Sequence, residues 1–155
     1  MADSKRQKLI SAIVTRMALI NGAGSYTTNI AGRVKDSDTN WAQDQDTLPA
    51  ISVYDGDAIA EPTSVGNSRA TIHVMRVLIK YFAEQGTTAA NCRNGIKDIK
   101  TAIRQDDKWI VSSVPLAMQT REVREGIVRN EESFEVEGAE VEIEIQFITN
   151  KFNAE

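Results

Sequence analysis

The side chains of this 155-residue chain that could perform catalysis are few and lie far apart in the sequence. Three acidic residues near the ends of expected strands, Asp55, Asp57 and Glu84, could hold Mg²⁺ as the carboxylates of two-metal nucleases do. Acidic residues at strand ends more often form turns. A metal-dependent nuclease is therefore kept only as an alternative.

Cys92 and His73 are the one cysteine and the one histidine of the chain. A nucleophilic thiol needs a base beside it, and these two residues fall in different expected elements. We expect Cys92 to be a small core residue on the apolar face of a helix. We expect His73 to be structural or solvent-facing in a half-buried strand. One cysteine excludes an internal disulfide and leaves no Cys/His set for a structural zinc site.

Motifs for nucleotide or serine chemistry are missing from the sequence. Gly22 and Gly24 follow an expected helix instead of a strand, and neither Gly-Lys-Ser nor Gly-Lys-Thr occurs, so a phosphate-binding loop is not indicated. The Gly-x-Ser-x-Gly turn that exposes a serine nucleophile is also missing. We expect a protein that is not an enzyme, with no catalytic residue, metal or cofactor.

Residues 35–47 are expected to form a flexible polar loop rich in aspartate. Spaced aspartates are typical of calcium loops, but the turn glycine and the closing glutamate of an EF-hand are missing. Trp41 is the strongly apolar residue of this loop, and it could cover the protein's own core or anchor a neighbouring subunit. The candidate interface residues of the loop are Asp38, Trp41, Asp44 and Asp46.

Residues 139–148 alternate between apolar side chains at odd positions and acidic or other polar ones at most even positions, which predicts a strand with one buried face. The acidic side chains of this strand are Glu140, Glu142 and Glu144. Neighbouring glutamates on one sheet face repel one another, so this row of side chains should face water or a molecule that must not bind to it.

Two helices are expected to hold the core. Ser4 can cap the first, which Gly22-Ala23-Gly24 would end, and the second begins at Thr88 or Asn91 and ends near residues 106–107. The apolar stripe of the first consists of Leu9, Ile10, Ile13, Met17 and Ile20. The second carries Cys92, Ile96, Ile99 and Ile103 on one side and Lys97, Asp98, Lys100 and Arg104 on the other.

The remaining segments are expected to be strands. Residues 26–34 form a short strand or extended arm, and residues 48–54 form a strand that Asp55-Gly56-Asp57 ends. Residues 69–82 form a long central strand that is apolar in part on both faces or bulged near Val74. Residues 114–125 form a strand that ends before Gly126. We predict a single α+β domain over residues 1–155, whose mixed, mostly antiparallel sheet has two main helices packed on one face.

The composition excludes several classes of function. With 41% hydrophobic and 26% charged residues the chain has the composition of a globular domain. Its net charge of −4 gives no overall electrostatic footprint for gripping nucleic acid. No segment reaches the roughly 20 apolar residues of a membrane span. The N-terminal residues do not support a secretory signal. We expect the protein to reside in the reducing interior of a cell and to have no membrane partner.

Four features in this order resemble the tail terminator proteins of tailed bacteriophages, of the lambda type. They are the strand Leu48–Tyr54, the long strand after it, the helix segment Ile96–Ile103 followed by Asp106-Asp107-Lys108-Trp109, and the closing strand. The resemblance covers most of the chain and rests on patterns of hydrophobic type. It implies an α+β domain that assembles into a six-fold ring on the tail tube, stops tube growth and forms the joint to the neck. For residues 106–109 it implies only a helix-ending turn in which Trp109 covers the core.

The resemblance also implies partners and a location. These are other copies of the chain in a hexamer, the tail tube protein, and a neck or head-completion protein, in the virion at the head-proximal end of the tail, after assembly in the bacterial host cytoplasm. DNA would pass through the ring without specific binding, and Glu140, Glu142 and Glu144 could supply an acidic lumen lining that repels phosphate. The same residues could instead lie on an outer, solvated sheet face. Another head–tail connector or neck adaptor is the alternative within the same class.

Overall fold

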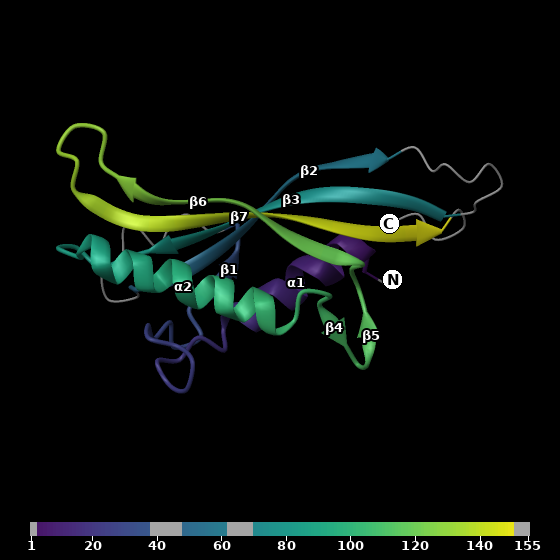
Figure 1. The fold of residues 1–155 in the computed structure, drawn as a ribbon, viewed down its shortest axis with the longest axis horizontal. Helices are drawn as coiled ribbons and strands as arrows, with labels where there is room; N and C mark the ends of the chain where they lie inside the picture. The colour runs from purple at the N-terminus through teal and green to yellow at the C-terminus, as the bar shows by residue number, and fades with distance from the viewer. Residues whose placement is uncertain (1–2, 38–47, 62–69, 151–155) are drawn as a thin grey trace.

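The computed structural model describes residues 3–37, 48–61 and 70–150, which form two helices and seven strands (Figure 1). In chain order these elements are α1 (Lys5–Met17), β1 (Val34–Asp36), β2 (Ala50–Glu61), β3 (Ala70–Phe82), α2 (Ala89–Gln105), β4 (Ile110–Val111), β5 (Val114–Pro115), β6 (Gln119–Arg129) and β7 (Val136–Asn150). The main sheet has the order β1-β2-β3-β7-β6, in which β1 and β2 are parallel and the other neighbours antiparallel. The predicted α+β class with a mixed, mostly antiparallel sheet is confirmed.

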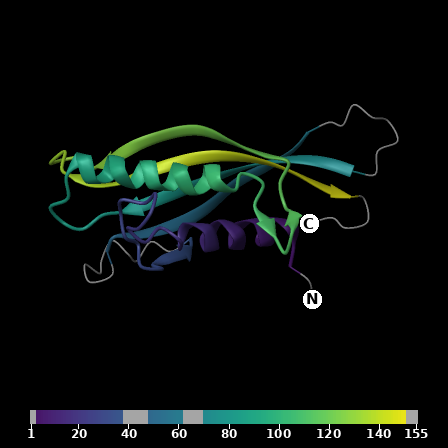
Figure 2. The same ribbon diagram turned by 60° about the horizontal axis from the view of Figure 1, so that its bottom comes forward.

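The helices and the sheet form two layers. α1 packs against β1 and β2, and α2 packs against β7, β6 and β3, so both helices cover the same face of the main sheet (Figure 2). This is the predicted arrangement. We call the opposite face of the main sheet the outer face.

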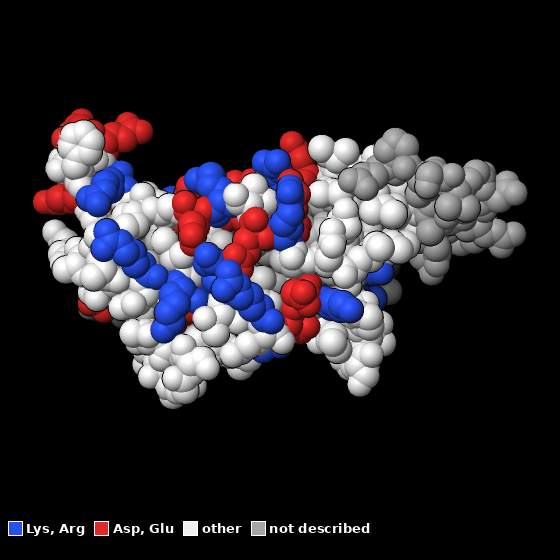
Figure 3. Space-filling model, in the orientation of Figure 1, with Lys and Arg blue, Asp and Glu red and all other residues white. Residues whose placement is uncertain are grey.

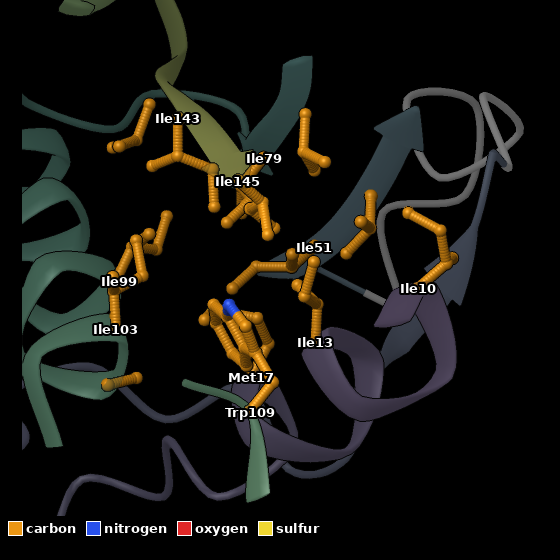
Figure 4. Close-up of a cluster of buried hydrophobic side chains, with 14 of the residues drawn as sticks. Ile10, Ile13, Met17, Ile51, Ile79, Ile99, Ile103, Trp109, Ile143 and Ile145 are labelled. Carbon is orange, nitrogen blue, oxygen red and sulfur yellow. The ribbon is translucent and has the colours of Figure 1, made fainter. Parts of the chain in front are cut away.

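The core lies between these two layers. Isoleucine side chains from the sheet meet Ile13 and Met17 of α1 and Ile99 and Ile103 of α2 (Figure 4). Trp109, four residues after the end of α2, is 1% exposed and donates its indole N–H to Thr120 Oγ1 at 2.9 Å. The expectation that this tryptophan covers the core is confirmed.

Both helices begin at the predicted caps. Ser4 Oγ accepts a hydrogen bond from the backbone N–H of Gln7 at 3.0 Å, and Thr88 Oγ1 accepts one from that of Asn91 at 3.2 Å. Gly95 lets α2 approach the sheet, since a Cβ at this position would lie 3.2 Å from the ring of Tyr81. α1 ends at Met17, before the glycines expected to end it.

Asp98 was expected on the charged side of α2, and this prediction is wrong because the side chain is fully buried. Its carboxylate accepts hydrogen bonds from the backbone N–H groups of Thr27 and Thr28, at 3.0 and 2.6 Å, and from the hydroxyl of Thr28 at 2.6 Å. Of the short strand or extended arm expected over residues 26–34, only Val34 belongs to a strand. The backbone donors of Thr27 and Thr28 bind Asp98 instead of a neighbouring strand.

Several strand boundaries differ from those expected. Lys35 and Asp36, placed in the polar loop, belong to β1, where they pair with Ser52 and Val53. β2 continues through the Asp-Gly-Asp segment as a bulge between Asp55 and Ala58, because the long partner β3 offers ladder positions beyond it. β3 itself pairs with β7 without a register shift, so the first of the two alternatives holds and β3 is apolar in part on both faces. The bulge lies in its neighbour β2. The expected strand over 114–125 divides into β5 and β6, and β6 runs through Gly126 to Arg129.

Candidate functional site

Of the acidic residues considered for a nuclease site, Asp55 and Asp57 lie together at the bulge of β2, and Glu84 lies elsewhere in the fold. Asp55 pairs with Val77 in the middle of β3 and forms an ion pair with Arg6 of α1 at 2.6 Å, while Glu84 lies beyond the end of β3. Arg6 also donates to the carbonyl of Gly56 at 2.6 Å, so Asp55 helps to attach α1 to the bulge of β2. Within the described ranges, no group of three or more Cys, His, Asp or Glu side chains is placed to hold a metal ion.

Cys92 and His73 are also far apart. Cys92 is fully buried, and burial raises the pKa of its thiol, which disfavours the nucleophilic thiolate. His73 stacks on Phe147 with ring centroids 5.0 Å apart, and its Nε2 lies 2.7 Å from Thr149 Oγ1. Eight residues of β3, roughly 26 Å, separate His73 from Tyr81, beside which Cys92 lies. The expected core role of Cys92 and the structural role of His73 are confirmed.

Asp38, Trp41, Asp44 and Asp46 lie outside the described residues, and their role stays a prediction.

The acidic row of β7 is part of a charged array on the outer face. Glu140, Glu142 and Glu144 alternate with buried residues, as predicted. Arginines from β3 and β6 lie on both sides of this row, and we call the six side chains the Arg–Glu ladder: Arg76, Arg121, Arg124, Glu140, Glu142 and Glu144.

Each glutamate of the ladder is paired with at least one arginine. Arg124 contacts Glu140 at 2.6 Å and Glu142 at 3.2 Å, and Arg76 bridges Glu142 at 3.1 Å and Glu144 at 3.2 Å. Arg121 contacts Glu144 at 2.6 Å. The hydrogen bonds that Arg124 donates to Glu140 and Glu142, together with the negative charges of these residues, raise the pKa of the Arg124 guanidinium. Cross-strand pairs of opposite charge remove the repulsion expected for a bare acidic row.

The ladder presents cations outermost. The arginine side chains are 52–68% exposed, whereas the glutamate side chains are 17–22% exposed. Blue and red side chains are interleaved over this region in Figure 3. The three positive and three negative charges of the Arg–Glu ladder sum to zero. The ladder therefore forms a neutral surface, whereas β7 alone predicts an acidic one. Arg121 and Arg124 lie on β6, the strand directly before β7, whereas Arg76 lies 66 residues before Glu142. The sequence contains all three arginines, but only the strand register shows that they lie opposite the glutamates.

A second surface, which the sequence analysis missed, is the hairpin formed by β4 and β5. It projects from the body between α2 and β6 (Figure 1), and its tip carries uncharged residues (Figure 3). The turn is Ser112-Ser113, with φ of 50° and 66°, a two-residue turn with both residues in the left-handed region. Hydrogen bonds from Leu116 N and Ala117 N to the carbonyl of Lys108, at 3.1 and 3.0 Å, fix the base.

The side chains of the hairpin are apolar on both of its faces. Val111 pairs with Val114 and Ile110 pairs with Pro115, and since successive residues point to opposite sides, one pair lies on each face. Ile110 is 53% exposed and Val114 is 58% exposed, and Met118 just beyond the hairpin is also exposed. The sequence signal was the pair of short apolar segments around Ser112-Ser113, which lacks the Asn-Gly or Asp-Gly that identifies such turns.

A cavity of about 810 Å³ opens at the far end of the main sheet, where β3 ends and β7 begins. We call it the end groove. Its apolar lining consists of Leu48, Tyr81, Phe82, Ala83, Val128, Phe134 and Val136, and its charged lining residues are Lys80, Glu84, Arg129, Glu135 and Glu137. Phe134 is 71% exposed and has a φ of 59°, which is unusual for a bulky side chain.

The turn that carries Phe134 is held by its own hydrogen bonds. Asn130 Oδ1 accepts from the backbone N–H groups of Glu132 and Ser133, at 2.9 and 3.1 Å, and Arg129 donates to the carbonyl of Phe134 at 3.1 Å. Phe134 N in turn donates to the carbonyl of Asn130 at 3.0 Å. An exposed aromatic side chain on so constrained a turn has the form of an interface anchor.

Comparisons with known proteins add no family to this description. Neither a scan of protein-family models nor a search of curated proteins found a match to the chain. Among the described residues, neither helix has the length and apolar character needed to cross a membrane.

Proposed function

We propose that this protein is a structural virion protein that acts as the tail terminators of bacteriophages do. In this proposal it forms a ring, with six copies as the expected number, that caps the tail tube, stops its growth and joins the tail to the neck. The proposal rests on the resemblance in the sequence, and the α+β fold is of the class that this resemblance implies.

The observation that best supports an assembly role is the exposed hairpin β4–β5. Six consecutive residues, 110–115, are exposed, and four of them are apolar. Contiguous exposed apolar patches on soluble proteins often mark interaction sites. A folded domain that presents such a patch suits a building block of an assembly.

The Arg–Glu ladder supports the expectation that DNA passes without specific binding. Each ladder arginine is already paired with a carboxylate, so its charge is compensated before a phosphate approaches. Binding to duplex DNA draws its strength from cations that neutralise phosphates and release counterions. A neutral ladder would contribute little to such binding if it faced a channel, and equally little on an outer solvated face.

The proposed partners are the tail tube protein on one side of the ring and a neck or head-completion protein on the other. The proposed location is the head-proximal end of the tail in the virion, after assembly in the host cytoplasm. A different head–tail connector would use the same kind of fold and surfaces, and the test below separates the two.

Particles assembled in the absence of this protein provide the test. Electron micrographs should show tails longer than normal, because tube growth would lack its stop. Tails of normal length that are detached from heads would instead identify a connector and contradict the terminator proposal. Normal particles would contradict both. Complementation with Asp55→Asn protein should restore normal tail length. If the protein were a nuclease that used the Asp55 carboxylate, this variant would fail to complement.

A further inference from the structure

We propose that the hairpin β4–β5 of one copy inserts into the end groove of the next copy around the ring. This inference rests on the proposed ring, and it names the two surfaces that close it. The occupant of the groove is a second copy of this chain.

The hairpin has the form of an inserted element. A two-stranded hairpin is marginally stable by itself in water, and here apolar side chains cover both faces, Val111 and Val114 on one and Ile110 and Pro115 on the other. A hairpin that merely lay on its own body would bury one face. Two exposed apolar faces suit a slot that encloses the hairpin from both sides.

The end groove has the form of a receiving site. Its volume of about 810 Å³ lies in the range of roughly 300–1,000 Å³ that binding clefts in proteins occupy. Phe134 stands exposed at its edge on a turn held by Asn130, while Phe82 and Val136 are partly buried in its wall. Insertion of the hairpin would cover Phe134 and fill the groove with aliphatic side chains.

The positions of the two surfaces are those of a head-to-tail contact. The hairpin adjoins the start of β6 and the end of α2, whereas the groove adjoins the end of β6 and the turn before α2. β6 has 11 residues, which at about 3.3 Å per residue separates its ends by roughly 35 Å. Two different patches at opposite ends make a heterologous contact, which closes into a ring when the rotation between copies permits. An unrelated partner would need only one of the two patches.

The size of the contact bears on how the ring forms. A short hairpin covers less than the roughly 800 Å² per partner that stable pairs bury. In a closed ring each copy makes the contact twice, once with its hairpin and once with its groove. Isolated pairs should therefore be weak, and the closed ring should be the stable species.

Cross-linking between cysteine variants tests this contact directly. Ser112→Cys places a thiol at the hairpin turn, and Glu135→Cys places one at the groove, while the native Cys92 is fully buried. Each variant would be treated with a short bis-maleimide, alone and in an equal mixture, with and without tail tube protein. We expect dimers from the mixture, none from either variant alone, and a ladder up to the full ring from the double variant.

Three outcomes would overturn the inference. Dimers from Ser112→Cys protein alone would mean that hairpins contact each other. Rings seen by negative stain without cross-links in the mixture would refute this interface and leave the proposed function standing. Monomers under every condition would refute the ring and the interface together.

Variants at the hairpin supply a second readout. Ile110→Ser/Val114→Ser should raise the concentration needed for half-maximal ring formation by at least about tenfold, because two apolar side chains lose their burial in the contact. The melting temperature should stay near that of the wild type, since both side chains are exposed in the single copy. Ile59→Ser, at a 67% exposed isoleucine of β2, is the matched control and should assemble normally. Equal assembly of the hairpin and control variants would contradict the proposal.

Discussion

Asp98 is a buried carboxylate whose partners are hydrogen-bond donors of the segment between α1 and β1. It binds the backbone N–H groups of Thr27 and Thr28, and Lys97 Nζ lies 3.6 Å from its Oδ1. Asp98→Ala would remove the acceptor of these backbone donors, and losing a hydrogen bond to a charged group costs about 1.5–3 kcal/mol. We expect a loss of about 3 kcal/mol in the free energy of unfolding, measured by urea denaturation.

Asp107, an exposed residue beyond the end of α2, supplies the control for this prediction. Its substitution by alanine should change the free energy of unfolding by less than about 0.5 kcal/mol, as surface changes usually do. If Asp98→Ala and Asp107→Ala unfold at the same urea concentration, the carboxylate of Asp98 does not hold this segment.

Tyr81 gives the protein a predicted sensitivity to alkaline pH. Burial, with smaller contributions from Cys92, Glu84 and Asp98, raises the pKa of Tyr81 to about 12. The unfolded chain loses this phenolic proton near pH 10, whereas the folded protein keeps it up to about pH 12. The contribution of Tyr81 to stability is therefore complete below pH 10 and falls by about 1.4 kcal/mol per pH unit between pH 10 and 12.

Unfolding of wild-type and Tyr81→Phe protein at pH 9, 10 and 11 checks this sign. The difference in free energy of unfolding between the two proteins should be constant up to about pH 10. Above pH 10 the wild type should lose stability relative to Tyr81→Phe as the pH rises. Burial also raises the pKa of Cys92, whose contribution has the same sign, but both proteins share it. Parallel pH curves for the two proteins would show that Tyr81 titrates normally.

Single residues were predictable where a periodic pattern fixed their side of an element. Cys92 and Ile99 fall on the apolar stripe of α2, and both are fully buried. Asp98 is next to Ile99 in the sequence and is also fully buried, although its charge placed it on the solvent side in the sequence analysis. The donors that make its burial possible lie about 70 residues earlier in the chain, so a local pattern could not reveal them.

At the scale of an element, β7 offers a test of its two faces. Ile143 is fully buried among core side chains, and Ile143→Asp would place an unpaired charge there. We expect this variant to be unfolded, because the cost consumes much of a typical stability of about 5–15 kcal/mol. Glu142→Gln, on the outer face, should remain folded. Circular dichroism melts decide, and a well-folded Ile143→Asp protein would contradict the assigned faces.

The Arg–Glu ladder gives a prediction that depends on salt. Substituting all three of its arginines with glutamine would leave the glutamates of β7 as a bare acidic row, which repels itself. The melting temperature of this triple variant should fall in low salt and recover toward that of the wild type at about 1 M salt, where the Debye length is about 3 Å.

A companion variant separates charge from packing in the ladder. If the three glutamates are also changed to glutamine, the melting temperature should no longer respond to salt. A triple arginine variant that melts like the wild type in low salt would show that the arginines do not compensate the row.

The elements show why the sequence predicted the layers better than the surfaces. Alternation in β7 and the apolar stripes of α1 and α2 depend on neighbours within each element, and these were predicted correctly. The bulge in β2 and the split between β5 and β6 depend on the partner strands and on hydrogen bonds to Lys108 and Gln146. The hairpin is local, but its Ser112-Ser113 turn lacks the residues that usually identify such a turn. The end groove forms only after distant segments are brought together.

At the scale of the whole molecule, a head-to-tail ring makes assembly sensitive to a minority of defective copies. A subunit with Ile110→Ser/Val114→Ser keeps its groove and accepts a neighbour, but it cannot donate its own hairpin. Each such copy would interrupt the chain of contacts. We expect the yield of rings to fall much more steeply than the fraction of wild-type protein as the variant is mixed in.

Analytical ultracentrifugation or negative-stain counts of such mixtures measure this effect, with Ile59→Ser as the inert additive. A yield that falls only in proportion to the wild-type fraction would mean that rings tolerate a missing hairpin. That result would argue against one hairpin contact between every pair of neighbours.

The Arg–Glu ladder also has a consequence for how this chain can change over evolutionary time. A ladder position tolerates either sign of charge as long as its cross-strand neighbours change with it, because compensation is a property of pairs such as Arg121 and Glu144. In relatives, these positions of β3, β6 and β7 should therefore covary, with arginine and glutamate exchanging places across strands. If β7 alone were compared among relatives, the sign of the charge at each ladder position would vary. The net charge of the ladder positions on all three strands would stay near zero.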